Sequence, residues 1–401
     1  MKILKNKNIV LGVSGGIAAY KAPELLRILQ KAGATVRVVM TKNACDFISP
    51  LTFEALCGDA VLTDLFDGSY KSAIGHIDLA KECDAAVIAP ATANIIAKLA
   101  NGIADDALTT FMLAVKGRKI VCPSMNDAMY DNAAVKRNII RLEADDYIIA
   151  EPSEGYLACK TEGKGRLADC DKIADKICEA LTTKDLMWKK ILVTAGPTRE
   201  FIDPVRFISN PSSGKMGYAI ADAARKRGGN VILISGPTLI EPPEGIKFIK
   251  IVSAKQMADN VFMNAQDADI IIKAAAVSDY RAEETFEHKV KKAKADRITL
   301  NFCKNTDILK KLGLNKKKGQ IVVGFAAETK DLEQNAFKKL EEKNLDIIAG
   351  NIVGKPDSGF EADTNKAVLF FKSGKKEVLP LMSKDELADI ILDRILKSPV
   401  A

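Results

Sequence analysis

The sequence has few of the residues from which metal and disulfide sites are built. Only two histidines are present, His76 and His288, which excludes an imidazole-rich metal centre. The eight cysteines form no CxxC pair or other metal spacing, so we interpret them as buried thiols, with one available as a nucleophile or acid. No apolar run reaches the roughly 18 to 20 residues of a membrane-spanning helix, and the glycine-broken N-terminal stretch does not match a signal peptide. A cytoplasmic protein that binds no membrane is therefore predicted.

The formal net charge of +7 is unevenly distributed along the chain. Basic residues concentrate in His288–Arg297 and in Lys316–Lys318. This pattern is consistent with a solvated basic loop or with a site for the phosphate groups of a ligand, and the sequence leaves both interpretations open. Nucleic-acid binding is not expected, because no aromatic residues interleave with the charge and no recognition motif accompanies it.

Short apolar runs alternate with helical patterns in each half of the 401-residue chain. Runs of this length and continuity, separated by helices, indicate parallel strands that are buried on both faces. The predicted fold class is therefore α/β, with two doubly wound domains and mainly parallel sheets. The nine runs are Asn8–Val13, Thr35–Met40, Asp84–Ala89, Arg118–Cys122, Lys190–Thr194, Asn230–Ser235, Asp269–Ala275, Gln320–Phe325 and Asp346–Ala349.

The predicted domain boundary lies where one helical pattern ends and a new strand begins. The helical pattern Asp171–Leu181 is followed by the polar stretch TTKD, and the next predicted strand starts at Lys190. The predicted domains are therefore residues 1–181 and 190–401, joined by a short linker at 182–189. Because ligands bind outside the carboxyl ends of the strands in such sheets, the residues after each run are the candidate site residues.

The turn after the first predicted strand is rich in glycine. Gly12, Gly15 and Gly16 depart from the GxGxxG spacing of dinucleotide sites, so a mononucleotide fits better than NAD. Backbone N–H groups at the start of the following helix can hold a phosphate. Thr92 and Asn94, after the third predicted strand, are interpreted either as ligand-binding residues or as ordinary helix caps.

Three motifs of the first half are Pro123–Tyr130 (PSMNDAMY), Gly75-His76-Ile77 and Gly155–Arg166. They resemble, in that order, the PxMNxxMW motif, the histidine segment and the mobile, cysteine-carrying substrate flap of the flavin-containing phosphopantothenoylcysteine decarboxylases. Tyr130 stands in place of the usual tryptophan, and Lys160 in place of the glycine that commonly follows the cysteine. The resemblance implies a flavoprotein-type domain that binds FMN. The residues predicted to bind FMN are Gly15, Gly16, Ile17, Thr41, Pro90, Ala91, Thr92 and Asn94.

The same resemblance implies chemical roles for three residues. Loss of CO2 from a cysteine carboxylate needs an electron sink, and oxidation of the thiol by the flavin would supply one. Asn126 would hold the carboxylate through its amide N–H, and His76 would assist deprotonation or positioning of the thiol. Cys159 would return a proton as a general acid.

The first helix of the second half begins with a glycine–lysine pair that does not form a P-loop. Ser209 stands where the first glycine of such a loop is required, and Met216 replaces the required Ser or Thr. The segment Ser212-Ser213-Gly214 nevertheless begins a helix. Its hydroxyl and N–H groups can therefore hold a phosphate.

ISNPSSGKMG, KAAAVSDY at Lys273–Tyr280 and KVKK at Lys289–Lys292 resemble motifs of bacterial phosphopantothenate–cysteine ligase. The resemblance implies a Rossmann-like domain that activates the carboxylate through an acyl-nucleotide. It implies CTP, although no residue chooses the base, with Mg2+ held mainly by the triphosphate. Lys289 would act on the phosphates or during attack by the cysteine amine, Asn210 would hydrogen-bond the acyl intermediate, and Asp279 would contact the nucleotide. The other predicted nucleotide or substrate residues are Ser212, Ser213, Gly214, Ala275, Lys291, Lys292, Thr306, Asp307, Ile308, Leu309, Phe325, Lys339 and Lys343.

The resemblance spans nearly the whole chain and predicts a bifunctional enzyme of coenzyme A synthesis. Such an enzyme joins 4'-phosphopantothenate to L-cysteine and decarboxylates the product to 4'-phosphopantetheine. Homo-oligomers are implied, with trimers of the flavin domain and dimers of the ligase domain. One alternative is another FMN-dependent cysteine decarboxylase or flavoprotein fused to a nucleotide-binding domain of different specificity, which the second set of motifs disfavours. A non-catalytic flavoprotein and a nicotinamide reductase are disfavoured by the presence of Asn126 and Cys159 and by the glycine spacing.

Overall fold

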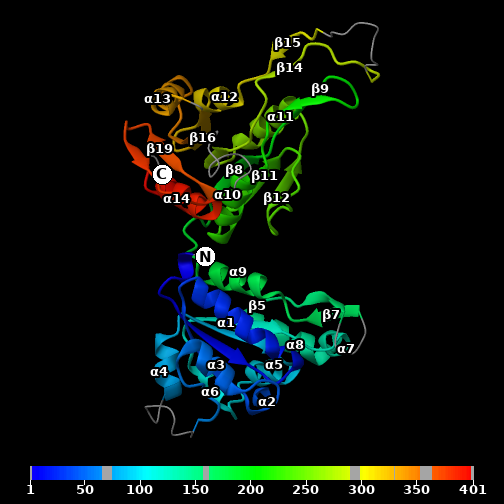
Figure 1. Ribbon diagram of the computed structural model, residues 1–401, viewed down its shortest axis with the longest axis vertical. Coiled ribbons are helices and arrows are strands. Elements are labelled where there is room, and N and C mark those ends of the chain that lie inside the picture. The colour runs from blue at the N-terminus through cyan, green and yellow to red at the C-terminus, as the bar shows by residue number, and fades with distance from the viewer. Residues whose placement is uncertain are drawn as a thin grey trace. The chain divides into compact units, whose positions relative to one another are not determined.

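The computed structural model describes residues 2–65, 75–156, 162–289, 299–328, 330–352 and 364–398. The chain divides into two compact units, Met1–Thr182 (unit 1) and Thr183–Ala401 (unit 2). Each unit is a sheet covered by helices on both faces (Figure 1). Within the described ranges, no helix combines the length and apolar character needed to cross a membrane.

Unit 1 is built around a five-stranded parallel sheet in the order β2-β1-β3-β4-β5. β3 is buried at all seven positions because helices cover both faces of the sheet. The strand order reverses between β1 and β3, and this topological switch point is where ligands bind in doubly wound sheets. The strands are β1 (Asn8–Val13), β2 (Thr35–Met40), β3 (Ala85–Ala91), β4 (Arg118–Pro123) and β5 (Tyr147–Ile149).

Two apolar cores hold the helices of unit 1 against its sheet. α1, α3 and α9 share one core, and α4, α5, α6 and α8 share the other. Each fully buried leucine or isoleucine in these cores contributes about 1.5–3 kcal/mol relative to exposure. The remaining elements are η1 (Lys2–Leu4), η2 (Ile17–Lys21), α1 (Ala22–Lys31), α2 (Lys42–Cys45), α3 (Pro50–Cys57), α4 (Gly75–Glu82), α5 (Ala93–Ala100), α6 (Ala107–Ala114), α7 (Asp127–Asp131), α8 (Ala133–Ala144), the hairpin strands β6 (Ser153–Tyr156) and β7 (Glu162–Arg166), and α9 (Cys170–Leu181).

Unit 2 contains an eight-stranded sheet in the order β12-β11-β8-β13-β16-β17-β19-β20. Its first six strands are parallel and follow the 3-2-1-4-5-6 order of Rossmann folds, with the switch point between β8 and β13. β19 and β20 extend the sheet in antiparallel fashion. The strands are β8 (Lys190–Ala195), β11 (Asn230–Ser235), β12 (Lys247–Lys250), β13 (Ile270–Lys273), β16 (Ile321–Glu328), β17 (Ile347–Ile352), β19 (Ala367–Phe371) and β20 (Lys376–Val378).

The helices of unit 2 also form two layers. α10 and α14 pack on one face of the sheet, and α11, α12 and α13 pack on the other. The antiparallel pair β14–β15 extends from the body of the unit (Figure 1). This pair and the antiparallel pair β9–β10 are together called the arm. The elements are β9 (Arg199–Phe201), β10 (Phe207–Ser209), α10 (Lys215–Lys226), α11 (Ala254–Ala265), β14 (Tyr280–Ala282), β15 (Phe302–Lys304), α12 (Ile308–Leu314), α13 (Leu332–Glu342), β18 (Thr364–Asn365), β21 (Met382–Ser383) and α14 (Lys384–Leu396).

The predicted fold class is confirmed, and all nine predicted runs correspond to strands of the two sheets. Four runs were predicted to begin one residue too early, one at Gln320 and three at the carboxylates of Asp84, Asp269 and Asp346. Each of these carboxylates accepts a hydrogen bond from a backbone N–H near the amino-terminal end of a neighbouring strand, so the aspartate side chain binds that strand where the backbone ladder has not yet begun. The three donors are the N–H groups of Asn8, Lys190 and Val322, at 2.9, 2.7 and 2.8 Å.

Candidate active sites

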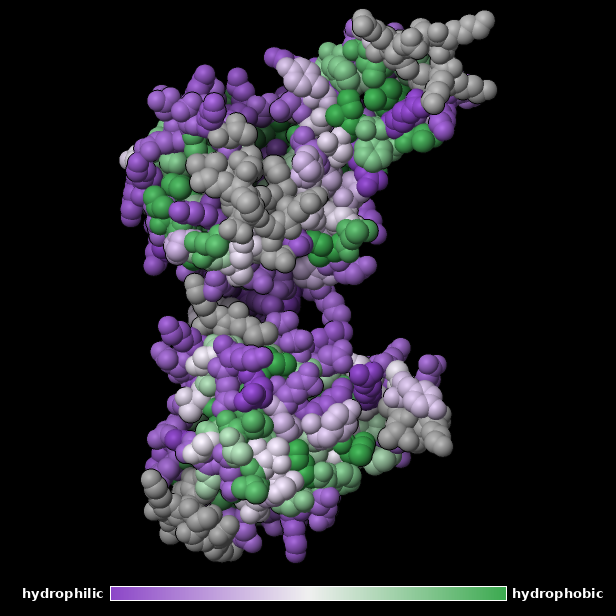
Figure 2. All heavy atoms as spheres, viewed as in Figure 1, coloured by the Kyte–Doolittle hydropathy of each residue, from purple (hydrophilic) through white to green (hydrophobic). Residues whose placement is uncertain are grey.

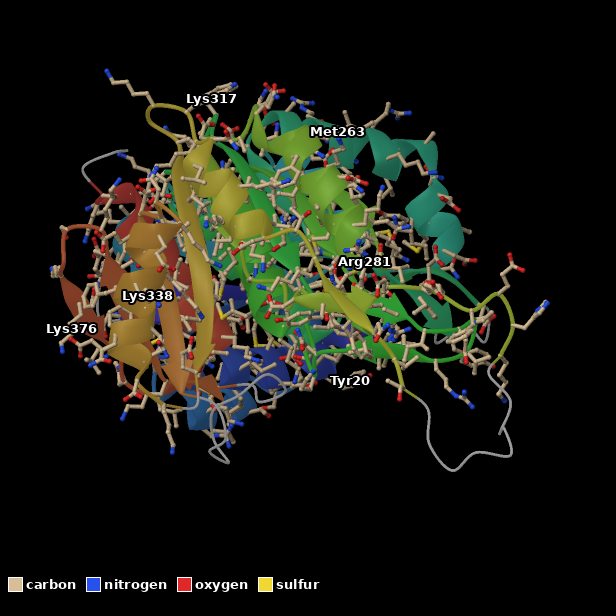
Figure 3. All side chains as sticks on the ribbon, turned by 90° about the horizontal axis from the view of Figure 1, so that it is seen from above. Tyr20, Met263, Arg281, Lys317, Lys338 and Lys376 are labelled. Carbon is tan, nitrogen blue, oxygen red and sulfur yellow. The ribbon has the colours of Figure 1, made fainter. Side chains whose placement is uncertain are left out.

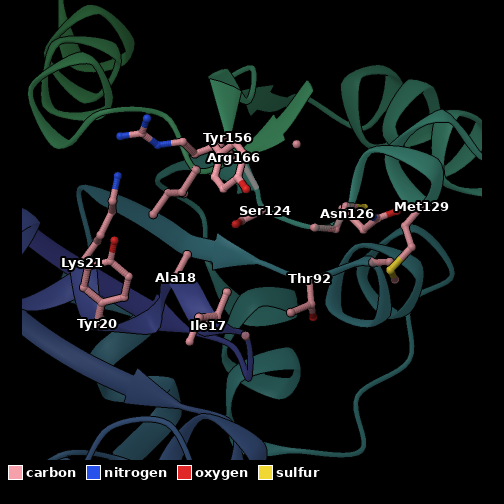
Figure 4. Close-up of a pocket in the computed structure, with 15 residues that line it drawn as sticks. Ile17, Ala18, Tyr20, Lys21, Thr92, Ser124, Asn126, Met129, Tyr156 and Arg166 are labelled. Carbon is pink, nitrogen blue, oxygen red and sulfur yellow. The ribbon is translucent and has the colours of Figure 1, made fainter. Parts of the chain in front are cut away.

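A cavity of about 650 Å³ lies in unit 1 beyond the carboxyl ends of β1, β3 and β4. Its walls come from η2, the start of α5, the β4–α7 turn and the β6–β7 hairpin. Lys21 and Arg166 lie at one end of the cavity, whereas Asn126 and Met129 lie at the other (Figure 4). Of the predicted FMN residues, Gly16, Ile17 and Thr92 line this cavity.

The turn between β1 and η2 is held in place by close packing and a buried hydroxyl. A Cβ at Gly15 would lie 2.8 Å from the backbone carbonyl carbon of Asn43, so this position requires glycine. Ser14 is buried, and its Oγ donates to the Pro90 carbonyl oxygen at 2.8 Å and accepts from the Thr92 N–H at 3.0 Å. The sequence prediction missed Ser14, although its place within the glycine-rich turn was a usable signal.

The remaining predicted FMN residues surround the cavity without all lining it. Thr92 is the N-cap of α5 and accepts from the Ile95 N–H at 3.4 Å, which confirms the helix-cap interpretation and leaves the ligand role a prediction. Thr41 caps α2 in the same way, and Asn94 is exposed in the first turn of α5. Pro90 and Ala91 are the last residues of β3, and neither is among the described residues that line the cavity.

Asn126 is the N-cap of α7, and its side chain lines the cavity. Its Oδ1 accepts from the Ala128 N–H at 2.9 Å, which fixes the orientation of the amide. His76, half-buried in the first turn of α4, is not among the described residues that line the cavity. Cys159 lies outside the described residues.

The β6–β7 hairpin is packed directly on the β4–α7 turn. The Met125 N–H donates to the Gly165 carbonyl oxygen at 2.9 Å, and a Cβ at Gly165 would overlap the Met125 carbonyl oxygen. A Cβ at Gly163 would lie 2.7 Å from the Cβ of Asp127. The two glycines therefore allow the hairpin to approach α7 closely enough to present Tyr156 and Arg166 to the cavity.

Tyr130 adds a polar anchor between α7 and this hairpin. Its hydroxyl donates to Glu151 Oε2 at 2.8 Å, and the Lys164 Nζ lies 2.7 Å from the same oxygen and 5.5 Å from the tyrosine ring centroid. Burial and the neighbouring Glu151 carboxylate raise the pKa of Tyr130 well above its ordinary value. Burial works to raise the pKa of Glu151 too, but the hydrogen bonds from Lys164 and Tyr130 outweigh it and lower that pKa.

In unit 2, the loops that follow β8 and β13 meet at the switch point. The Ala276 N–H donates to the Gly196 carbonyl oxygen at 2.9 Å, and the Ser278 N–H donates to the Thr198 hydroxyl at 3.0 Å. Asn210 lies against the loop that follows β13, where its Nδ2 donates to the carbonyl oxygens of Ala276 and Val277, both at 3.3 Å. The structure therefore brings Asn210 to the switch point of unit 2.

The predicted phosphate-holding segment lies at the same place. Gly214 is the N-cap of α10 with φ +79°, a left-handed conformation that favours glycine. A Cβ there would lie 2.7 Å from the Thr238 Cγ2 and 3.3 Å from the Gly196 backbone nitrogen. Ser212 and Ser213 are half-buried in the turn before it, and the Ser212 Oγ accepts from the Gly214 N–H at 3.4 Å.

A cluster of ion pairs borders this site on the side of α12 and α13. Lys343 Nζ lies 2.8 Å from the Oδ2 of Asp307, the N-cap of α12, and Lys339 Nζ lies 2.6 Å from Glu328 Oε1. Burial works to raise the pKa of Asp307, but the hydrogen bond from Lys343 outweighs it and lowers that pKa. Lys339 lies in α13, and Lys343 is its C-cap. This cluster also contains Lys273, which the prediction did not name as a site residue.

The other predicted ligase residues differ in their surroundings. Ile308 and Leu309 are buried in a core, so their side chains stabilise α12, and Ala275 is buried as well. Phe325 is half-buried in β16, Asp279 is exposed after β13, and Thr306 lines a second cavity of about 610 Å³ beside α11.

The lysine motif was predicted to join this site. Lys289 is exposed on the arm and makes no hydrogen bond or ion pair with any other described residue. Lys291 and Lys292 lie outside the described residues. No group of three or more His, Cys, Asp or Glu side chains able to hold a metal occurs in the described part of the chain.

Comparison with known proteins gives matches over both units. The family model "Flavoprotein" matches residues 2–182, and the model "DNA/pantothenate metabolism flavoprotein C-terminal domain" matches residues 186–398. The chain is 51% identical over 397 residues to the coenzyme A biosynthesis bifunctional protein CoaBC of Bacillus subtilis, covering 98% of this chain and 97% of that protein. It is 44% identical over 395 residues to the CoaBC protein of Haemophilus influenzae, covering 98% of each. The crystal structure of the C-terminal domain of a CoaBC protein matches at 44% identity and a TM-score of 0.46, covering 53% of this chain and 96% of that one.

Proposed function

Because the chain belongs to the family of bifunctional coenzyme A biosynthesis proteins, we propose that each unit holds one of two active sites. The chain is a phosphopantothenate–cysteine ligase and an FMN-dependent phosphopantothenoylcysteine decarboxylase. We assign decarboxylation to unit 1 and ligation to unit 2. The observation that supports this assignment is that each unit gathers its own set of polar residues at its own switch point.

The cavity of unit 1 suits FMN and the cysteine end of the substrate. Its volume of about 650 Å³ falls within the range of about 300–1,000 Å³ that is typical of cofactor sites. The flavin, when bound, supplies the oxidation that makes loss of the carboxylate possible. Asn126 binds the carboxylate through its amide N–H, since its Oδ1 faces the start of α7. Cys159 then acts as the general acid, and His76 assists at the thiol.

In unit 2, the proposed site binds CTP, 4'-phosphopantothenate and L-cysteine. The turn at Ser212–Gly214 offers hydroxyl groups and the start of a helix to a phosphate. Asn210 is fixed beside it and hydrogen-bonds the acyl-nucleotide. Lys289 and its neighbouring lysines neutralise the triphosphate, and Mg2+ is held mainly by the triphosphate oxygens. Asp279 contacts the nucleotide.

We further propose that the protein is a cytoplasmic homo-oligomer, with dimers of unit 2 and trimers of unit 1. Support for pairing of unit 2 comes from its arm, where apolar side chains are exposed together and appear as green patches in Figure 2. An apolar surface of this kind is typical of an interface with another chain. The exposed side chains are Phe201, Val205, Phe207, Phe286 and Phe302.

One assay tests both activities. The purified protein is incubated with 4'-phosphopantothenate, L-cysteine, Mg2+ and one nucleoside triphosphate at a time, and product masses are recorded. We expect 4'-phosphopantetheine and CMP when CTP is supplied, and 4'-phosphopantothenoylcysteine alone when the flavin has been removed. Equal turnover with every triphosphate would exclude the proposed preference for CTP, and full decarboxylation by flavin-free protein would exclude the proposed role of FMN.

A further inference from the structure

Lys273 occupies a position of β13 where the strand pattern requires an apolar side chain. Ile270 and Ile272 face the core shared with α10 and α14, whereas Ile271 faces the opposite core. Because side chains alternate along a strand, Lys273 continues the row of Ile271 on the face covered by α12 and α13. The lysine is half-buried there, at the carboxyl end of a central strand and next to the switch point.

Two carboxylates near Lys273 are paired with other lysines, whereas Asp279 acts on Lys273 from beyond ion-pair distance. Asp307 binds Lys343 at 2.8 Å, and Glu328 binds Lys339 at 2.6 Å. The hydrogen bond of the Lys273 Nζ goes to the carbonyl oxygen of Ala275 at 3.4 Å, and no carboxylate of the described residues lies within ion-pair distance. An ammonium group that is partly removed from water without an anionic partner costs free energy, which an anionic ligand would recover.

Burial and the neighbouring lysines disfavour the protonated form of Lys273. Burial and the Lys343 ammonium, with a smaller effect of Lys339, lower the pKa of Lys273 to about 8, while Asp307 and Asp279 only partly oppose them. The amine is therefore about half protonated near pH 8 in the unliganded protein. Glu328 lies in the same cluster, with its charge paired to Lys339.

We propose that Lys273 is a further ligand-binding residue of the ligase site, where it binds a phosphate oxygen of a substrate and takes up a proton as it does so. The inference rests on the proposed function of unit 2, because the residues proposed to hold the nucleotide surround this lysine. A phosphate close to the amine stabilises its charged form and so raises the pKa. Proton uptake by Lys273 should therefore be largest at and above pH 8. It should vanish near pH 6.5, where Lys273 is already protonated in the unliganded protein.

Isothermal titration calorimetry of the full-length protein tests this proposal. Mg2+–CTP and 4'-phosphopantothenate are titrated separately at pH 8.0 and 6.5, each in two buffers of different ionisation enthalpy. We expect uptake of about half a proton at pH 8.0 and close to none at pH 6.5. The ligand that produces the uptake is the one whose phosphate reaches Lys273.

Three variants identify the group that takes up the proton. Lys273→Met should abolish the uptake and weaken binding of that ligand by about tenfold or more. Lys273→Arg should restore binding without uptake, because a guanidinium is always protonated, and it serves as the decisive variant should the methionine protein fail to fold. The control Lys338→Met removes an exposed lysine next to Lys339 and should leave both quantities unchanged.

Different outcomes test the role of Lys273 and the assignment of ligation to unit 2. Binding to the wild-type protein without proton uptake at pH 8.0 would overturn the role of Lys273, as would undiminished uptake in Lys273→Arg. If neither ligand binds to wild-type protein that still decarboxylates 4'-phosphopantothenoylcysteine, the proposed ligase site itself is wrong and the inference falls with it.

Discussion

At the scale of single residues, Tyr130 shows how a departure from a family motif can be accommodated. Its ring belongs to the core of unit 1, while its hydroxyl and the Lys164 ammonium meet on one oxygen of Glu151. These contacts connect α7 to the strand β7, which contributes Gly165 and Arg166 to the cavity. Tyr130 thus supports the position of the hairpin and does not only fill the core.

We expect Tyr130→Phe to destabilise unit 1 by about 1–2 kcal/mol, because Glu151 loses one hydrogen bond while the ring stays buried. Urea denaturation followed by flavin fluorescence measures the change. The matched control is Tyr147→Phe, since the hydroxyl of Tyr147 makes no hydrogen bond with any described residue, although the ring is buried. Equal effects of the two substitutions would show that the contact with Glu151 contributes nothing.

At the scale of elements, the start of α10 depends on two glycines that pack against each other. Gly214 and Gly196 both have positive φ, and Gly214 lies against the backbone of Gly196 and the methyl group of Thr238. This contact places the Ser212–Gly214 turn directly over the end of β8. A side chain at Gly214 would push the turn away from the proposed phosphate position.

Gly214→Ala should therefore lower the ligase kcat/KM more than tenfold and leave decarboxylation unchanged. An alanine in the left-handed conformation costs about 1–2 kcal/mol by itself, and we expect the free energy of unfolding to fall by more than this amount. Gly245→Ala is the matched control, because Gly245 has φ +78° with nothing within 4 Å of an added Cβ, so it bears only the backbone cost. Steady-state kinetics and thermal unfolding measure both effects. If the two variants behave alike, the close approach at Gly214 is irrelevant to ligation.

The sequence predicted the central strands well and the outer strands poorly. Central parallel strands are buried on both faces, so they read as continuous apolar runs. β12 and β20 lie at sheet edges and contain exposed lysines, which interrupt the apolar run by which a strand is predicted. β5 spans only three residues, too few to form such a run. Lys376 on β20 projects from the edge of unit 2, where its charge discourages pairing with another strand (Figure 3). β19 is apolar but antiparallel, and the alternation of strand and helix gave no signal for it.

The candidate sites were predictable where a motif lies in one short segment. Asn126 and Gly16 line the same cavity, as expected for residues that follow neighbouring strands. Lys273 and Ser14 were missed because their importance depends on partners far away in the sequence, such as Lys343 and Pro90. No local pattern reveals that a carboxylate near a lysine is already paired with another lysine.

At the scale of the whole molecule, the two proposed reactions are divided between the two units. Each unit has its own sheet, its own two cores and its own switch point. A substitution that changes one switch point should therefore leave the chemistry of the other unit intact.

The most direct test is the mass of the product that Asn126→Asp protein makes from 4'-phosphopantothenate, L-cysteine, Mg2+ and CTP. Aspartate keeps the oxygen that caps α7 but removes the amide donor and repels a carboxylate, so folding and flavin binding should be preserved. We predict accumulation of 4'-phosphopantothenoylcysteine at the wild-type rate of ligation, with no 4'-phosphopantetheine. Formation of 4'-phosphopantetheine at the wild-type rate would contradict the role of Asn126 in decarboxylation, and loss of ligation in the folded, FMN-loaded variant would contradict the independence of the two sites.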